Sequence, residues 1–206
     1  MNKIFIEAKD RKTSEYHFLQ TILKRFFPEK DVGFIFMNGI GNLFGETILN
    51  QISVAQESGE QVLVLADADT VAKGAGYAKR KEDIDRGMGN HALSFPYFLY
   101  PDNQKDGDVE ELMEKAVRRD LHTAFFDCFE DYEKCVSGIK DKNGVSRYNV
   151  PNLKGKLHTY MTAQKLSRKL RDKLGSGDWL FDESDYWNLD VDALQPLKDF
   201  LAAHLK

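Results

Sequence analysis

The chain has 206 residues and a mass of 23.6 kDa, enough for one hydrophobic core with a small helical addition. Hydrophobic residues make up 42% and charged residues 30%, as in ordinary soluble globular proteins, and no apolar stretch is long enough to cross a bilayer. The net charge of −4 argues against a protein that coats nucleic acid non-specifically, but not against a nuclease, because a metal ion can neutralise a scissile phosphate.

The first third of the chain predicts alternating strands and helices. An acid interrupts the apolar residues near the N-terminus, so we expect no signal peptide, a cytoplasmic protein and no membrane partner. Residues 3–7, 32–37 and 62–66 are short apolar runs typical of strands, and apolar residues at helical spacing predict helices over 13–27 and 43–57. This alternation implies parallel strands whose carboxyl ends lie at one edge of a sheet. The run 62–66 is apolar throughout, which indicates a central strand buried on both faces.

The middle of the chain is more polar. The charge run 79–86 predicts a solvated helix or loop, or alternatively a mobile segment that lends Lys79 or Arg80 to a phosphate. Residues 93–100 predict a fourth strand, and Pro96 within it indicates an edge position or a bulge. Asp108 is expected to cap a helix that carries acids in its first turn.

The rest of the chain is expected to be mainly helical. Helices are predicted over 121–139 and 153–174, the second of them basic and amphipathic, and again near the C-terminus from Pro196 onward. Aromatic residues at helical spacing in the first of these are interpreted as core rather than as a base-stacking platform, namely Phe125, Phe129 and Tyr132. We therefore expect an α/β core over residues 1–118 and a helical extension over residues 119–206, packed together as one structural domain.

Acidic residues follow the predicted strands. Glu7 ends the first strand, Asp67 and Asp69 follow the central one, and Glu110 or Glu111 opens the helix after the fourth. Because the carboxyl ends of parallel strands meet at the edge where ligands bind, we expect these acids to form one cluster. If the chain stays extended through residue 69, the two aspartates point to the same side and repel unless a cation lies between them or one holds a proton. Oxygen-only ligands suit Mg²⁺ or Mn²⁺, so the pattern predicts a divalent metal site.

The arrangement of these acids resembles the Toprim domain of topoisomerases, primases, small ribonucleases and OLD-type nucleases. The matching residues are Glu7 with Asp10 in Ile-Phe-Ile-Glu-Ala-Lys-Asp, and the Asp67-Ala-Asp69 pair. Residues 100–112, with Tyr-Pro-Asp-Asn and Gly-Asp-Val-Glu-Glu-Leu, and residues 187–201 are similar to an uncharacterised prokaryotic Toprim-like family of unknown function. The resemblance covers most of the chain and implies a Toprim-like, Rossmann-like fold: a mainly parallel sheet flanked by helices, with a helical C-terminal extension.

The resemblance also implies metal-assisted hydrolysis of nucleic-acid phosphodiesters, with DNA or RNA as the expected partner and Mg²⁺ or Mn²⁺ as cofactor. Asp67 and Asp69 would hold the metal, and Glu7 would act as a metal ligand or as a general acid/base. Glu110 would be a further ligand, and Lys156 matches a basic catalytic residue. The residues expected to contact the substrate are Lys9, Asp10, Asn38, Asp102 and Asn103.

Two other functions fit parts of the sequence. The stretch Asp67-Ala-Asp69-Thr70-Val71 also matches the nucleophile loop of haloacid-dehalogenase-like phosphatases, in which Asp67 would attack phosphate and Asp69 would be the acid/base. In that family the loop usually follows the first strand, whereas here two strands precede it, and Glu7 is left without a role. The third hypothesis is a Toprim-like scaffold that binds a nucleotide or a partner protein without turnover. DNA, RNA and a nucleotide all remain candidate substrates.

Overall fold

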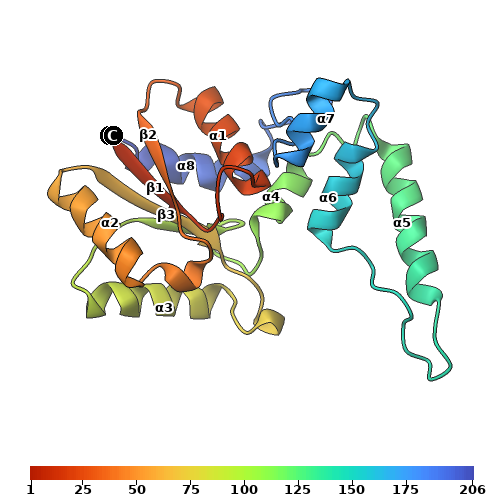
Figure 1. Ribbon diagram of the computed structural model, residues 1–206, viewed down its shortest axis with the longest axis horizontal. Helices are drawn as coiled ribbons and strands as arrows, with labels where there is room; N and C mark the ends of the chain where they lie inside the picture. Colours follow the sequence, from red (N-terminus) through yellow and green to blue (C-terminus); the bar gives the residue numbers. More distant parts are fainter.

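The computed structural model describes residues 1–206 and contains a four-stranded parallel sheet with eight α-helices (Figure 1). The strands lie in the order β2-β1-β3-β4, and every neighbouring pair is parallel. Their bounds are β1 (Asn2–Ile6), β2 (Val32–Phe36), β3 (Gln61–Asp67) and β4 (Tyr97–Tyr100). The predicted α/β, Rossmann-like fold is thus confirmed, and the carboxyl ends of all four strands lie at one edge of the sheet.

The burial of the central strand β3 and the edge position of β4 agree with their sequences. β3 lies between β1 and β4, and its residues 62–66 are all buried, as the continuous apolar run predicts. β4 is an edge strand and begins at Tyr97, four residues later than predicted. Pro96 has no N–H to donate to a ladder, although its carbonyl oxygen still accepts a hydrogen bond from the Val64 N–H at 3.1 Å.

Each face of the sheet has its own hydrophobic cluster, because side chains alternate along a strand. Leu63 and Leu65 of β3 face a cluster of 31 buried residues, whereas Val64 and Ala66 face a second cluster of 13. Residues from α1 (Ser14–Phe26), α4 (Val109–Ala116) and α8 (Gln195–His204) cover the first face, and residues from α2 (Glu46–Glu57) and α3 (Tyr77–Asn90) cover the second (Figure 1).

The helical extension contains α5 (Thr123–Gly138), α6 (Leu153–Thr162) and α7 (Arg168–Gly175), and α5 lies farthest from the sheet (Figure 1). The prediction of one continuous helix over 153–174 was wrong, because the chain leaves helical geometry after α6 and starts α7 anew. Ser167 is the N-cap of α7, and its side chain accepts a hydrogen bond from the Leu170 N–H at 3.4 Å. In α5, Phe129 is buried as predicted, whereas Tyr132 is 49% exposed, so the core interpretation was wrong for Tyr132.

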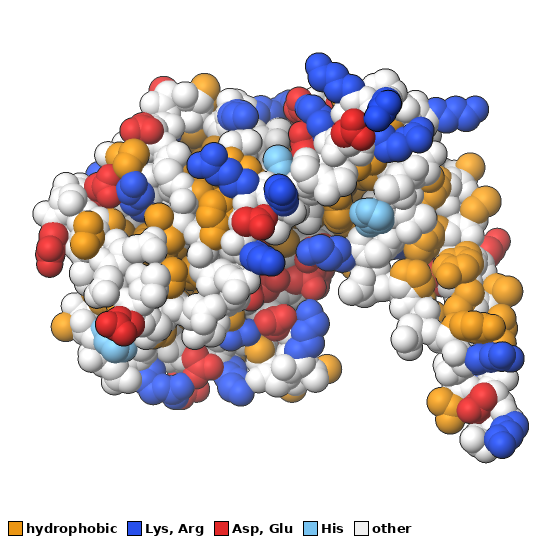
Figure 2. Space-filling view, in the orientation of Figure 1, with side chains coloured by type: hydrophobic (Ala, Val, Ile, Leu, Met, Phe, Trp, Pro, Cys, Tyr) orange, Lys and Arg blue, Asp and Glu red, His pale blue; other side chains and the backbone are white.

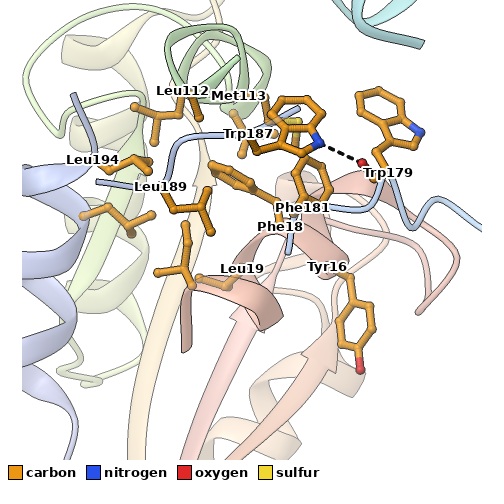
Figure 3. Close-up of a cluster of buried hydrophobic side chains, with 14 of the residues drawn as sticks. Tyr16, Phe18, Leu19, Leu112, Met113, Trp179, Phe181, Trp187, Leu189 and Leu194 are labelled. Carbon is orange, nitrogen blue, oxygen red and sulfur yellow. Dashed lines mark hydrogen bonds between the residues drawn. The ribbon is translucent and has the colours of Figure 1, made fainter. Parts of the chain in front are cut away.

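The chain between α7 and α8 packs the extension against the first face of the sheet (Figure 3). The indole N–H of Trp187 donates to the carbonyl oxygen of Trp179 at 2.8 Å, and its ring lies 4.7 Å from that of Phe181. The Phe181 ring in turn lies 5.1 Å from the ring of Phe18 in α1. The two predicted parts of the chain therefore share one hydrophobic cluster. No helix combines the length and the apolar character that a membrane crossing requires.

Candidate functional site

Four carboxylates from four elements lie at the carboxyl edge of the sheet. Glu7 follows β1, Glu15 lies in the first turn of α1, Asp67 ends β3 and Glu110 lies in the first turn of α4. We call these four residues the acidic cluster. The charges of the other three residues raise the pKa of Asp67, and those of Glu7 and Glu110 raise the pKa of Glu15. Of the acids predicted to converge, Glu7, Asp67 and Glu110 lie near one another, whereas Asp69 pairs with Arg80 and Lys73 instead.

Backbone N–H groups hold two of these carboxylates in place. The Glu7 side chain accepts hydrogen bonds from the N–H groups of Ile40 and Asp67, each at 3.2 Å. Asp67 Oδ1 accepts the N–H of Val109 at 2.9 Å, at the start of α4. Asp108 occupies the N-cap position of α4 as predicted, but its side chain makes no cap hydrogen bond. The capping acceptor of this helix is thus supplied by Asp67, which lies far away in the sequence.

Asp67 is electrostatically unfavourable in its ionised form. Burial raises the pKa of this carboxyl well above its ordinary value, and the nearby charges of the other cluster residues raise it further. The hydrogen bond from the Val109 N–H acts in the opposite direction, because it favours the charged form. A buried acid beside other acids is a common feature of functional sites.

Glu15 is the cluster residue that the sequence did not reveal. Burial, followed by the charges of Glu7 and Glu110, raises the pKa of Glu15 to about 8. Its Oε1 atom is buried and has no hydrogen-bond partner. The only sequence signal is an acid two residues after the N-cap Thr13, which is typical of any helix start and carries no functional meaning by itself.

Lys154 is the lysine that contacts the acidic cluster. Its Nζ lies 2.7 Å from Oε1 of Glu110, which is 6% exposed. Burial lowers the pKa of Lys154, but the charges of Glu110, Asp67 and Glu15 outweigh this and raise it above its ordinary value.

Lys156, the lysine favoured by the sequence, lies elsewhere. Its Nζ is 3.7 Å from Glu114, and it lies 5.8 Å and 6.0 Å from the ring centroids of Phe126 and Phe129. The structure therefore places Lys154 at the acidic cluster and Lys156 between α4 and α5. The two lysines are neighbours in one helical turn, so spacing alone did not distinguish them.

Asp69 lies just beyond the acidic cluster, in a second group of charges. The chain does not stay extended at this residue, because its φ is +57°, so the condition under which Asp67 and Asp69 would point to the same side is not met. The backbone N–H and carbonyl oxygen of Asp69 both bond to Gly107, at 2.7 Å and 2.9 Å. The Asp69 carboxylate pairs with Arg80 at 2.8 Å and Lys73 at 3.3 Å. Arg80 belongs to α3 (Tyr77–Asn90), so of the predicted helix or loop over this charged segment the structure has the helix.

Asp108 joins the same group. Its Oδ2 lies 3.6 Å from Lys73 Nζ, and its Oδ1 is buried without a hydrogen-bond partner. Burial and the charge of Glu110 raise the pKa of Asp108, against the opposing effect of Lys73. Asp108 thus lies between the acidic cluster and the Asp69–Arg80 pair.

The residues predicted to contact substrate fall into two classes. Asp10 accepts the Lys12 N–H at 2.6 Å, and Asp102 accepts the N–H groups of Gln104 and Lys105 at 3.0 Å and 2.9 Å, so both close local turns. Asn103 Oδ1 accepts the N–H of Leu99 in β4 at 3.1 Å, which stabilises the end of that strand. Lys9 and Asn38 are exposed at the same edge of the sheet.

The donor chemistry of the acidic cluster fits a hard divalent cation. All four side chains supply oxygen ligands, Lys154 pairs with Glu110 alone, and a buried oxygen of Glu15 has no hydrogen-bond partner. As the side chains stand, no three His, Cys, Asp or Glu residues form a ready set of metal ligands. Glu7 and Asp67 direct oxygens at backbone N–H groups, so their carboxylates would share an ion only after a side-chain rotation or through their remaining lone pairs.

Comparison with known proteins gives one match. The family described as a protein of unknown function, DUF3226, matches residues 2–206. No curated protein and no solved structure matches the chain.

Proposed function

Since the chain belongs to the DUF3226 family, whose description names no activity, we propose its function from the acidic cluster: divalent-metal-dependent hydrolysis of nucleic-acid phosphodiesters. The observation that carries this proposal is the raised pKa of Asp67 and Glu15 at the carboxyl edge of a parallel sheet, beside the buried Glu110 that pairs with Lys154. That edge is where open α/β sheets bind their ligands. Because burial and neighbouring charges disfavour the ionised forms of Asp67 and Glu15, a bound cation would stabilise them.

Glu7, Glu15, Asp67 and Glu110 would hold Mg²⁺ or Mn²⁺. When bound, such an ion polarises the phosphodiester and lowers the pKa of an attacking water. Asp69 is not a metal ligand in this proposal, because its carboxylate is already paired with Arg80 and Lys73.

The cations beside the acidic cluster would bind the substrate. Arg80 is held by Asp69 at 2.8 Å, and a guanidinium fixed in this way presents its other N–H groups to phosphate oxygens. Its Nε is buried and has no hydrogen-bond partner. Lys154, on the other side, keeps its ammonium beside Glu110 and would donate to the leaving oxygen.

The test is cleavage of supercoiled plasmid and of single-stranded RNA with Mg²⁺, Mn²⁺ or EDTA. We expect metal-dependent cleavage by the wild type, and a loss of at least about 100-fold in Glu7→Gln and Asp67→Asn, a size typical of removing a key catalytic interaction. Glu29→Gln is the matched control, because this glutamate is exposed and makes no ion pair. Cleavage that persists in both site variants, or in EDTA, would overturn the proposal.

The same protein preparations distinguish the rival hypotheses. An acid-stable phospho-enzyme at Asp67 would support the haloacid-dehalogenase-like phosphatase. Calorimetric binding of Mn²⁺ that depends on Asp67, without cleavage of any substrate, would support a scaffold that binds without turnover.

A further inference from the structure

The outer face of α7 carries cations that the proposed hydrolytic site does not use. Lys165 precedes the helix and Arg168, Lys169 and Arg171 lie on it; all four are exposed, and none makes an ion pair. Figure 2 shows basic side chains gathered over α7. In a chain with a net charge of −4, four unpaired cations within seven residues are a local concentration of positive charge.

This basic surface reaches the acidic cluster through a backbone contact. Gly177 follows α7 and packs so closely on the loop between β1 and α1 that a Cβ at this position would lie 2.9 Å from the carbonyl carbon of Lys12. The loop begins with Glu7 and ends at Thr13, two residues before Glu15. It carries three exposed cations that make no ion pair, namely Lys9, Arg11 and Lys12.

The loop and the segment after α7 are in contact at Gly177, and we call the exposed cations of the loop and of α7 together the cationic track. One part lies in the loop that joins Glu7 to α1, and the other part lies on α7 and just before it. Its members are Lys9, Arg11, Lys12, Lys165, Arg168, Lys169 and Arg171.

The chemistry of the track favours a phosphate polymer over a membrane. The apolar residues of this segment, Leu166, Leu170 and Leu174, pack against the hydrophobic cluster of the first sheet face. A helix that lies in a membrane surface needs exposed apolar side chains to insert, and α7 leaves none. Spaced, unpaired cations without apolar neighbours are the usual contacts to a nucleic-acid backbone.

We propose that the cationic track binds the phosphate backbone of a polynucleotide and leads it from α7 to the acidic cluster. The substrate is then a polymer, because a mononucleotide at the acidic cluster would leave α7 without a role. This inference rests on the proposed function, since it names the class and the path of the substrate.

The test combines Lys165→Gln, Arg168→Gln, Lys169→Gln and Arg171→Gln in one α7 variant. The matched control removes four other cations that are exposed and make no ion pair, with the same change in net charge: Lys115→Gln, Lys140→Gln, Lys142→Gln and Arg147→Gln. Binding of a fluorescein-labelled 30-nucleotide single strand and of a 20-base-pair duplex is measured by anisotropy in EDTA, over a series of salt concentrations. Circular dichroism and thermal unfolding verify that each variant is folded.

We expect the α7 variant to bind at least 10-fold more weakly, with the slope of log K against log salt reduced by about 3, since each lost phosphate contact removes about 0.7 to 0.9. The control should keep wild-type affinity. Equal loss in both variants would show an effect of net charge alone and would overturn the track, as would wild-type affinity in the α7 variant. Binding of the wild type to phosphatidylserine vesicles but not to either oligonucleotide would also overturn it.

A small substrate separates this inference from the proposed function. Hydrolysis of bis(4-nitrophenyl) phosphate with Mn²⁺ needs the acidic cluster but not the track, so the α7 variant should keep it and Glu7→Gln should lose it. If the wild type binds polynucleotides through α7 but hydrolyses nothing, the proposed function fails and the track stands. If it hydrolyses the small substrate and the α7 variant binds polynucleotides normally, the track fails alone.

Discussion

Replacing Glu15 with glutamine tests the electrostatics of the acidic cluster directly. Glutamine has the shape of protonated glutamate, so it keeps the packing and removes only the charge that the carboxyl acquires at higher pH. Glu15 is buried beside Glu7 and Glu110, and its Oε1 has no hydrogen-bond partner, so the opposing effects of the Glu7 backbone and Lys154 offset the cost of ionisation only in part. Glu15→Gln should therefore stabilise the metal-free protein, and increasingly so as the pH rises.

The magnitude follows from the two pKa values of Glu15. Between its ordinary value of 4.5 and its folded value of about 8, the folded protein holds a proton that the unfolded chain has released. The free energy of unfolding of the wild type thus falls with pH in this interval, by up to about 1.4 kcal/mol for each pH unit from this group. The loss is complete above pH 8 and reaches at most about 5 kcal/mol, while glutamine does not titrate.

The assay is urea unfolding of the wild type and Glu15→Gln at pH 5, 7 and 9, in EDTA. The difference in free energy of unfolding should be small at pH 5 and about 3 to 5 kcal/mol in favour of the variant at pH 9. Glu29→Gln, at an exposed glutamate, should show no such trend. A difference that is constant or shrinks with rising pH would refute the reasoning, because it would mean that Glu15 ionises at no cost in the folded protein.

Three further results are expected. A Cβ on Gly87 of α3 would overlap the ring of Phe44, so Gly87→Ala should lower the free energy of unfolding by about 1 to 3 kcal/mol. A Cβ on Gly89 in the same helix meets nothing, so Gly89→Ala should raise the free energy of unfolding by up to about 1 kcal/mol. Urea unfolding measures both changes. Trp187→Phe removes the hydrogen bond to the buried carbonyl of Trp179 and should cost about 1 to 3 kcal/mol; an unchanged melting temperature would contradict this. Mg²⁺ should raise the melting temperature more at pH 8 than at pH 5.5, because only the ionised acidic cluster binds it well, and an equal shift at both pH values would argue against that site.

The sheet was predictable because its strands have strong local signals. The apolar run 62–66 required burial on both faces, and the central position of β3 fulfils this. Glu7, Asp67 and Glu110 were predictable as a group because strand ends converge by topology alone. The break before α7 was missed because helical spacing of apolar residues continues through it, while the signal for the new start is a single cap at Ser167.

The rest of the candidate site depends on contacts between distant segments. Asp69 leaves extended geometry because its backbone pairs with Gly107 in the loop before α4. The sequence Asp-Ala-Asp does not predict that pairing. Lys154 differs from Lys156 only in the direction in which α6 presents it. The pKa of Glu15 is raised because the folded chain buries this residue near Glu7, and its local sequence does not show this.

The capping of α4 by Asp67 has a mechanical consequence. The helix is anchored at one end by that carboxylate, and at the other end the Asn188 N–H bonds to the Ala116 carbonyl oxygen at 2.6 Å, next to Trp187. Its eight residues form a rigid rod about 12 Å long. A ligand that turns the Asp67 carboxylate would remove the anchor at the near end, and we expect the effect to reach Trp187 beside the far end. A change in tryptophan fluorescence on ligand binding is the expected readout.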